Sequence, residues 1–141
     1  MDRLIEFLGN HPFLTLAFVA ILGLLVGNEL LRFTRKYKEL GPSAIVPVMN
    51  RDDAVVIDVG EPNEYREGHL ANAELIPLGE LNQKLDKLAK HKDQPVVVYC
   101  RSGNRSARAC RMLAKHGFED LYNLAGGILA WENEKLPVKR K

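Results

Sequence analysis

A cysteine and two arginines lie close together in the segment 95–106, which reads PVVVYCRSGNRS. The apolar run 95–99 predicts a buried strand, with its proline at the first position, where a strand tolerates it. Cys100 follows that run directly, and the residues after a short turn favour a helix. In an open parallel sheet, ligands bind at the carboxyl ends of the strands. The residue order therefore predicts a sulfur atom at a ligand-binding edge.

The residues around Cys100 favour its thiolate form. The amide groups of a tight loop can turn inward around an anion, and the start of the following helix carries partial positive charge. Arg101 and Arg105 add full charges nearby, and in such settings a thiol pKa falls from about 8.5 to about 3.5–7.5. Gly103 permits the positive φ that a narrow loop needs, and Ser106 can cap the helix or donate to a bound anion. We expect Cys100 to be a nucleophile.

Other residues with chemical potential receive structural interpretations. The second cysteine, Cys110, is expected to pack within the following helix, with a resolving-thiol role as the alternative. Asp58 ends an earlier apolar run, where it either orients the Cys100 loop by hydrogen bonding or caps a neighbouring turn. We expect His69 to hold the turn at Gly68 and not to act as a general base. No cysteines and histidines have the spacing of zinc ligands, so we predict no metal.

The chain after residue 43 alternates predicted strands with predicted helices. We expect strands at 54–59, 74–76, 95–99 and 121–124, and a loop at 61–69. We expect helices at 43–50 (capped by Ser43), at 79–90, from the cysteine loop to Gly117, and at 128–134. Nearly continuous apolar strands between helices indicate a parallel sheet covered on both faces. The fold class is therefore α/β, with room for one domain, which we place at 44–137.

Several segments together resemble the rhodanese family. The loop Cys100–Ser106 matches the family's C-R-x-G-x-R-S pattern, and the segment 56–69 is similar to its I-D-V-R-E-P-x-E-Y…G-H-I segment. Residues 75–78 are similar to its N-I-P segment, and residues 124–131 to its closing L-x-G-G-x-x-x-W, which makes Trp131 a core residue. The resemblance implies a rhodanese-like domain with a parallel sheet of about five strands flanked by helices.

The resemblance also implies a two-step sulfur transfer. Cys100 would take sulfane sulfur from a donor such as thiosulfate, become a persulfide, and pass the outer sulfur to cyanide, a thiol or a protein cysteine. Arg101 and Arg105 would hold the anionic donor, while loop amides stabilise charge on the persulfide. No metal or organic cofactor is needed. The implied substrate-binding residues, with Asp58 in support, are Arg101, Ser102, Gly103, Asn104, Arg105 and Ser106.

One departure and two alternatives bear on this function. Gly60 stands where the family usually has arginine, so that arginine's role is either vacant or filled by Arg66 or Arg101, which affects substrate preference. A cysteine-based phosphatase would use C-x5-R, whereas Cys100 and Arg105 form C-x4-R, a tighter ring that suits sulfur better than phosphate. A membrane-tethered docking module for a membrane protein partner, with little or no catalysis, is the stronger alternative.

The first 35 residues are predicted to be a membrane anchor. Residues 12–31 carry one charge, Glu29, and twenty helical residues match a hydrocarbon core of about 30 Å. A signal peptide and a buried core helix are the alternatives, but Asp2 and Glu6 offset Arg3, and the run has no polar face.

The flanks of the span predict its orientation. Basic residues follow it at Arg32, Arg35, Lys36 and Lys38, so the positive-inside rule predicts a single-pass protein of the inner membrane with its catalytic domain in the cytoplasm. We expect a linker at 36–43, in which Tyr37–Ser43 is a connector, and a solvated basic tail at 138–141. A net charge of +2 without a broad basic stripe argues against nucleic-acid binding.

Overall fold

The computed structural model describes residues 1–140, apart from the side chains of residues 32–34. It contains two compact units, Met1–Arg35 and a second that begins at Lys36. The side chain of Arg32 and the whole of Lys141, which we assigned to the basic flank of the span and to the basic tail, lie outside the described part.

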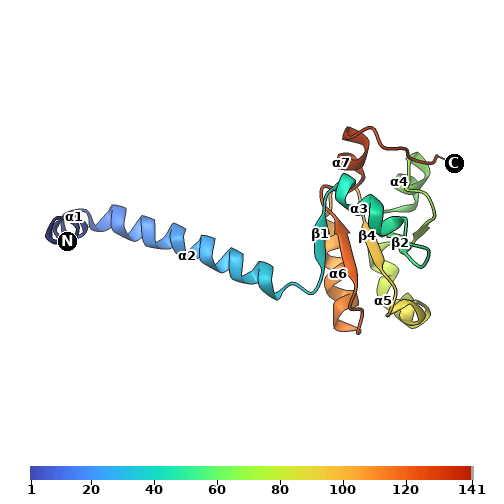
Figure 1. Cartoon of the computed structure of the whole chain (residues 1–141), viewed down its shortest axis with the longest axis horizontal. Helices are drawn as coiled ribbons and strands as arrows, with labels where there is room; N and C mark the ends of the chain where they lie inside the picture. Colours follow the sequence, from blue (N-terminus) through green and yellow to red (C-terminus); the bar gives the residue numbers. More distant parts are fainter. Residues whose placement is uncertain (141) are drawn as a thin grey trace. The chain divides into compact units, whose positions relative to one another are not determined.

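The second unit is built on a five-stranded sheet whose neighbouring strands are all parallel (Figure 1). The strand order is β1-β5-β4-β2-β3. The strands are β1 (Lys38–Leu40), β2 (Val55–Asp58), β3 (Ala73–Leu75), β4 (Val96–Tyr99) and β5 (Leu121–Leu124). The central strand β4 is the apolar run before Cys100, and all four of its residues are buried. The predicted α/β fold with about five parallel strands is confirmed.

Helices cover both faces of this sheet. Successive residues of β4 point to opposite faces, so Val96 and Val98 pack in one core cluster and Val97 and Tyr99 in the other. The first cluster includes residues of α5 (Leu81–Leu88) and α6 (Asn104–Lys115), and the second includes residues of α3 (Pro42–Met49) and α7 (Gly127–Asn133). Two short 3-10 turns, η1 (Leu78–Glu80) and η2 (Ala89–His91), flank α5. Trp131 is buried in the second cluster, as expected.

The segment expected to be a connector, Tyr37–Ser43, contributes a strand instead. Lys38–Leu40 pairs with β5 in register, and the N–H of Ala125 donates to the carbonyl of Leu40 (2.8 Å). Tyr37 is buried beside it. The pairing satisfies backbone groups of β5 that would otherwise form an open edge, and so a three-residue segment with two charged side chains becomes a strand.

The segment 61–69, expected to be a loop, contains helix α4 (Pro62–Glu67). Its start is defined by a reciprocal capping box between Glu61 and Glu64, with Pro62 at the first helical position. The polar composition of the segment led us to predict a loop, although the capping residues could be recognised in the sequence. Helix α3 likewise begins after Gly41 and not at Ser43, because Pro42 occupies its first turn.

Pro137 and Lys139 are hydrogen-bonded to the domain and do not form the start of a free, solvated tail. The backbone of Lys139 forms an antiparallel bridge with His69, with hydrogen bonds of 2.9 and 2.7 Å in the two directions. The indole of Trp131 donates to the carbonyl of Pro137 (2.9 Å). These contacts bring the described part of the basic tail against the domain.

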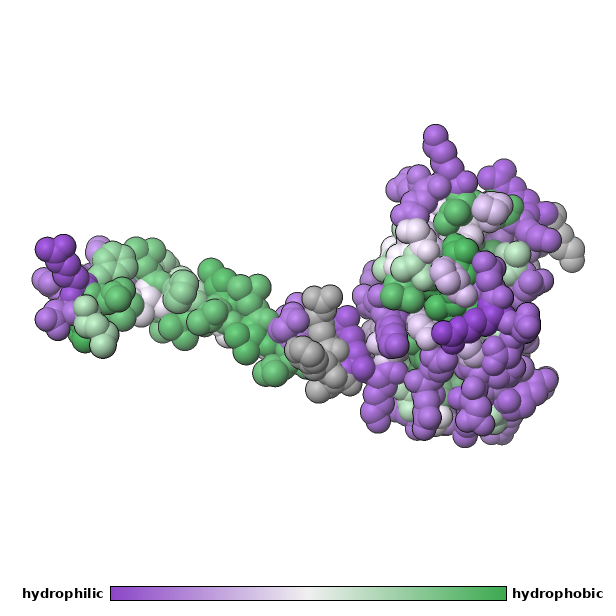
Figure 2. Space-filling view, in the orientation of Figure 1, coloured by the Kyte–Doolittle hydropathy of each residue, from purple (hydrophilic) through white to green (hydrophobic). Residues whose placement is uncertain are grey.

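The first unit consists of α1 (Asp2–Asn10) and α2 (Pro12–Thr34). Within α2, the stretch Pro12–Leu31 has a mean hydropathy of 2.1, and none of it is buried within the chain. Apolar side chains gather along this unit in the space-filling view (Figure 2). An uncovered apolar stretch of this length is not a core helix of this chain, and it could cross a membrane.

Candidate active site

Cys100 lies directly after the central strand, in a turn that leads into α6. It lines a cavity of about 240 Å³ at the carboxyl edge of the sheet, and its residue is only 1% exposed. The cavity wall mixes charges of both signs with a few apolar side chains. Its charged groups are Asp58, Glu64, Glu67, Glu132, Arg101 and Arg140. A small polar molecule that enters this cavity would lie beside Cys100.

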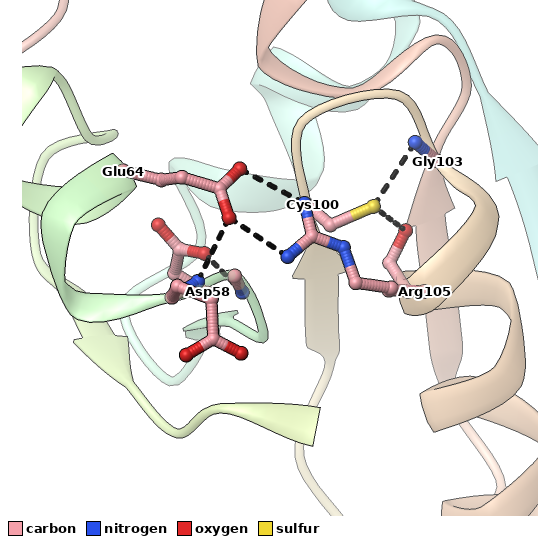
Figure 3. A network of polar contacts seen from close by, with 8 residues as sticks. Asp58, Glu64, Cys100, Gly103 and Arg105 are labelled. Carbon is pink, nitrogen blue, oxygen red and sulfur yellow. Dashed lines mark hydrogen bonds and ion pairs between the residues drawn. The ribbon is translucent and has the colours of Figure 1, made fainter. Parts of the chain in front are cut away.

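The turn after Cys100 points a backbone donor at the sulfur. The N–H of Gly103 donates to Cys100 Sγ over 3.1 Å (Figure 3). Gly103 has a φ of +101°, and a Cβ there would lie 3.3 Å from the backbone nitrogen of Gly126. Glycine is therefore needed both for the left-handed conformation and for the space.

The start of α7 holds the outer side of this turn. The N–H of Ile128 donates to the carbonyl of Cys100 (2.9 Å), and that of Leu129 donates to the carbonyl of Arg101 (3.2 Å). Gly127 allows this approach, because a Cβ there would stand 2.4 Å from the oxygen of Arg101. The second glycine of the L-x-G-G segment thus lets one helix dock on the cysteine turn.

These donors determine the ionisation of the sulfur. Burial raises the pKa of the Cys100 thiol, but the hydrogen bond that it shares with the Ser106 hydroxyl, in which either atom could donate, and those from the N–H groups of Ser106, Gly103 and Ser102 together bring the pKa below its ordinary value. Of the expected inward-facing amides, the N–H of Gly103 lies within hydrogen-bond distance of the sulfur, and those of Ser102 and Ser106 also lower its pKa. Ser102 and Asn104 are exposed, and Asn104 begins α6.

Arg105 is engaged by a carboxylate that the sequence analysis did not single out. Its two terminal nitrogens contact the two carboxylate oxygens of Glu64, from α4, at 2.8 and 2.9 Å (Figure 3). The guanidinium holds the pKa of Glu64 at about 2, below its ordinary 4.5. The charge of Arg105 is therefore matched inside the protein, while Arg101 lines the cavity. The donor-binding roles of both arginines stay predictions.

Asp58 is the last residue of β2 and makes the turn contact, one of the two roles that we left open. Its Oδ1 accepts the N–H of Gly60 over 2.8 Å, and its side chain also bonds to the hydroxyl of Tyr99. That hydroxyl in turn accepts the N–H of Leu70 (3.0 Å). Burial raises the pKa of Asp58, which lines the cavity with Cys100.

Gly60 leaves the wall of this site without the family's arginine. A Cβ at this position would lie 3.0 Å from Asp58 Oδ1, which is a tight contact. Of the two residues expected to replace that arginine, Arg101 lines the cavity, whereas the Arg66 guanidinium bonds back to the carbonyl of Pro62 (3.4 Å).

Ser106 does not cap α6, whose N-cap is Gly103. Its buried hydroxyl lies between Cys100 Sγ (3.4 Å) and Oδ1 of Asn123 (2.6 Å), a residue of β5. Asn123 is 2% exposed, and its Nδ2 donates to the carbonyl of Gly103 (3.3 Å). Asn123 was not among the predicted site residues, although a lone amide within a buried strand was the available signal.

The remaining candidates have structural surroundings. Burial raises the pKa of the Cys110 thiol to about 12, and its sulfur donates weakly to the carbonyl of Tyr122 (3.9 Å). The His69 ring stacks on Tyr65 with centroids 3.8 Å apart, and its Nδ1 bonds to the Tyr65 carbonyl (2.9 Å). These contacts favour packing for Cys110 and a turn-holding role for His69.

Comparisons with known proteins agree with this geometry. The family model described as Rhodanese-like domain matches residues 47–134. The chain is 32% identical over 141 residues to Uncharacterized protein YibN of Escherichia coli (strain K12), with 99% of each chain covered. It is 32% identical over 96 residues to Thiosulfate sulfurtransferase GlpE of Pseudoalteromonas translucida, covering 68% of this chain and 90% of that protein. Among solved structures, a rhodanese-related protein from Thermoplasma volcanium superposes with a TM-score of 0.67 at 32% identity, covering 74% of this chain and 100% of the other.

Proposed function

The chain belongs to the rhodanese family, and we propose that it is a sulfurtransferase that carries sulfane sulfur as a persulfide on Cys100. One observation carries the proposal: Cys100 lines a cavity at the carboxyl edge of a parallel sheet, and the N–H of Gly103 is directed at its sulfur over 3.1 Å. Such donors stabilise negative charge on sulfur, and a thiolate is the nucleophilic form of cysteine.

In the first step, the Cys100 thiolate attacks the outer sulfur of a donor such as thiosulfate. The new S–S bond forms as the sulfur–sulfur bond of thiosulfate breaks, and sulfite leaves with the electron pair. The product is a persulfide whose negative charge lies on the outer sulfur, so three negative charges enter the step and three leave it. Arg101 lines the cavity, which supports a role in attracting such an anion.

In the second step, a thiophilic acceptor attacks the outer sulfur. Cyanide would give thiocyanate, and a thiolate would give a new persulfide; either reaction returns Cys100 as a thiolate. The loop amides then receive the charge that builds up again on Cys100 Sγ. No metal or organic cofactor takes part in this scheme, because each step is a displacement at sulfur.

The apolar helix α2 supports a membrane location for this reaction. Pro12–Leu31 is long and apolar enough to span, and Arg35, Lys36 and Lys38 follow it. Basic residues on that flank favour a cytoplasmic position for the second unit. The acceptor would then be a cytoplasmic thiol or the cysteine of a protein at the inner membrane.

The test is mass analysis of the full-length chain, in detergent, after exposure to thiosulfate. We expect the peptide that contains Cys100 to gain the mass of one sulfur atom, and added cyanide to remove it as thiocyanate. Cys110→Ala is the matched control and should load normally, while Cys100→Ser should not load. A chain that takes up no sulfur yet retains a membrane partner equally well with Cys100→Ser would be a docking module, and efficient phosphoester hydrolysis would indicate a phosphatase.

A further inference from the structure

Asn123 is fixed in one orientation by a backbone carbonyl. Its side-chain nitrogen lies 3.3 Å from the oxygen of Gly103, and a carbonyl oxygen can only accept a hydrogen bond. The amide must therefore turn its nitrogen toward Gly103 and its oxygen toward Ser106. The Ser106 hydroxyl meets that oxygen at 2.6 Å, and both residues are almost wholly buried, at 0% and 2% exposure.

The Ser106 hydroxyl has one proton and two neighbours that could receive it. Asn123 Oδ1 is at 2.6 Å, within the range for a short O–H···O bond, whereas Cys100 Sγ is at 3.4 Å. With the proton directed at Asn123, the lone pairs of Ser106 face the sulfur. A protonated Cys100 then donates its S–H to Ser106, and every polar group in the chain of contacts is satisfied.

Ionisation of Cys100 disturbs this arrangement. A thiolate cannot donate, and the lone pairs of Ser106 would repel it. The hydroxyl must rotate to donate to the sulfur, which leaves Asn123 Oδ1 buried without its partner. An unsatisfied buried acceptor costs free energy. Asn123 and the thiolate therefore compete for the same proton.

We propose that Asn123 is a positioning residue that tunes Cys100 by holding the Ser106 proton, so that Ser106 accepts from the thiol and becomes a donor only when the sulfur is ionised. The proposal deepens the proposed function and rests on Cys100 being its nucleophile. The loop amides favour ionisation of the Cys100 thiol, and Asn123 opposes that ionisation through Ser106. The balance of these two effects determines how readily Cys100 reacts.

Charged groups also surround Cys100, and among them Arg105 interacts electrostatically with its sulfur. Those that share its cavity or its loop are Asp58, Glu64, Glu67, Arg101, Arg105, Glu132 and Arg140. None of them takes part in the hydrogen bonds that join Asn123 to Ser106 and Gly103. A change at Asn123 leaves their charges in place, so a comparison of variants isolates the hydroxyl.

The experiment measures the rate of alkylation by iodoacetamide against pH, on the full-length chain in detergent with Cys110→Ala, so that Cys100 is the only thiol. Valine suits a buried strand and removes the acceptor. We expect Asn123→Val to lower the apparent pKa of Cys100 by about 0.5–1 unit, the equivalent of one hydrogen bond. If Asn123 only braced the loop, the donors would loosen and the pKa would rise, and that result would overturn the proposal.

A double-mutant cycle makes the role of Ser106 explicit. In a Ser106→Ala background, Asn123→Val should leave the pKa of Cys100 unchanged, and an equal shift in both backgrounds would refute the mechanism. Asn123→Asp keeps the side-chain shape should valine not fold. Its stronger acceptor should raise the pKa more with Ser106 present than with alanine there, and an equal rise would again refute it. Alkylation needs no sulfur donor, so these results stand apart from the persulfide test. A chain that shows the shifts but takes up no sulfur would overturn the proposed function alone.

Discussion

Glu64 joins helix α4 to the start of α6 through its two hydrogen bonds to Arg105. Replacing Glu64 by glutamine tests how much this ion pair contributes to the free energy of unfolding. The Arg105 guanidinium lowers the pKa of Glu64 from its ordinary 4.5 to about 2. A change of that size corresponds to about 3 kcal/mol. Because the Arg105 side chain is 34% exposed, water screens the pair, and we expect about 1–2 kcal/mol.

The pH dependence follows from the direction of this change. Glu64 has a lower pKa in the folded chain than in the unfolded one, so its contribution to stability is complete above about pH 4.5. It is lost as the pH falls from there toward about 2, because the folded protein must then also take up the proton. Glu64→Gln should therefore be less stable than the parent at pH 7, and the difference should disappear in acid.

The assay is urea unfolding of the full-length chain in detergent, followed by tryptophan fluorescence between pH 7 and pH 2.5. Trp131 is buried in the second unit and reports its unfolding. Glu67→Gln is the matched control, since Glu67 also belongs to α4 and lines the cavity but makes no ion pair within the described residues. Equal stability of Glu64→Gln and parent at pH 7, or a difference that persists undiminished at pH 2.5, would refute the reasoning.

Three further changes probe other parts of the site and the anchor. Gly127→Ala should destabilise the chain by more than about 2 kcal/mol and abolish sulfur loading, because its Cβ would collide with the oxygen of Arg101. Denaturant unfolding measures the stability and mass analysis measures the loading; near-parental values of both would contradict the docking of α7 on the cysteine turn. Tyr99→Phe should cost about 1–3 kcal/mol in the same unfolding assay, because the N–H of Leu70 loses its buried acceptor. In membrane vesicles, protease should remove the second unit from inverted preparations only, and digestion in right-side-out vesicles would reverse the proposed orientation.

Local sequence order was sufficient to predict much of this structure. The run Val96–Tyr99 is buried on every residue, and such apolar runs identify central parallel strands without further information. Strand β1 could not be found in this way, because Lys38–Leu40 is short, carries two charged side chains and becomes a strand only by pairing with β5. Helix α4 was missed because its polar composition outweighed the capping box at Glu61 and Glu64.

In the candidate site, too, contacts within one segment could be predicted from the sequence, whereas contacts between distant segments could not. Cys100 and Gly103 lie in one continuous turn, so their meeting could be inferred from the sequence alone. Glu64 reaches Arg105 across 41 residues of chain, and Asn123 reaches Ser106 across 17. Those partners are set by the strand order, which brings β5 and the segment after β2 beside the central strand. A single sequence does not encode that order in any local pattern.

The docking of α7 on the cysteine turn also has a consequence for biosynthesis. Ile128 and Leu129 hold the carbonyls of Cys100 and Arg101, yet they leave the ribosome more than twenty residues after the cysteine does. Until they arrive, the carbonyls of Cys100 and Arg101 lack these two hydrogen bonds. We therefore expect the turn that carries the nucleophile to reach its final conformation only after synthesis of the last helix.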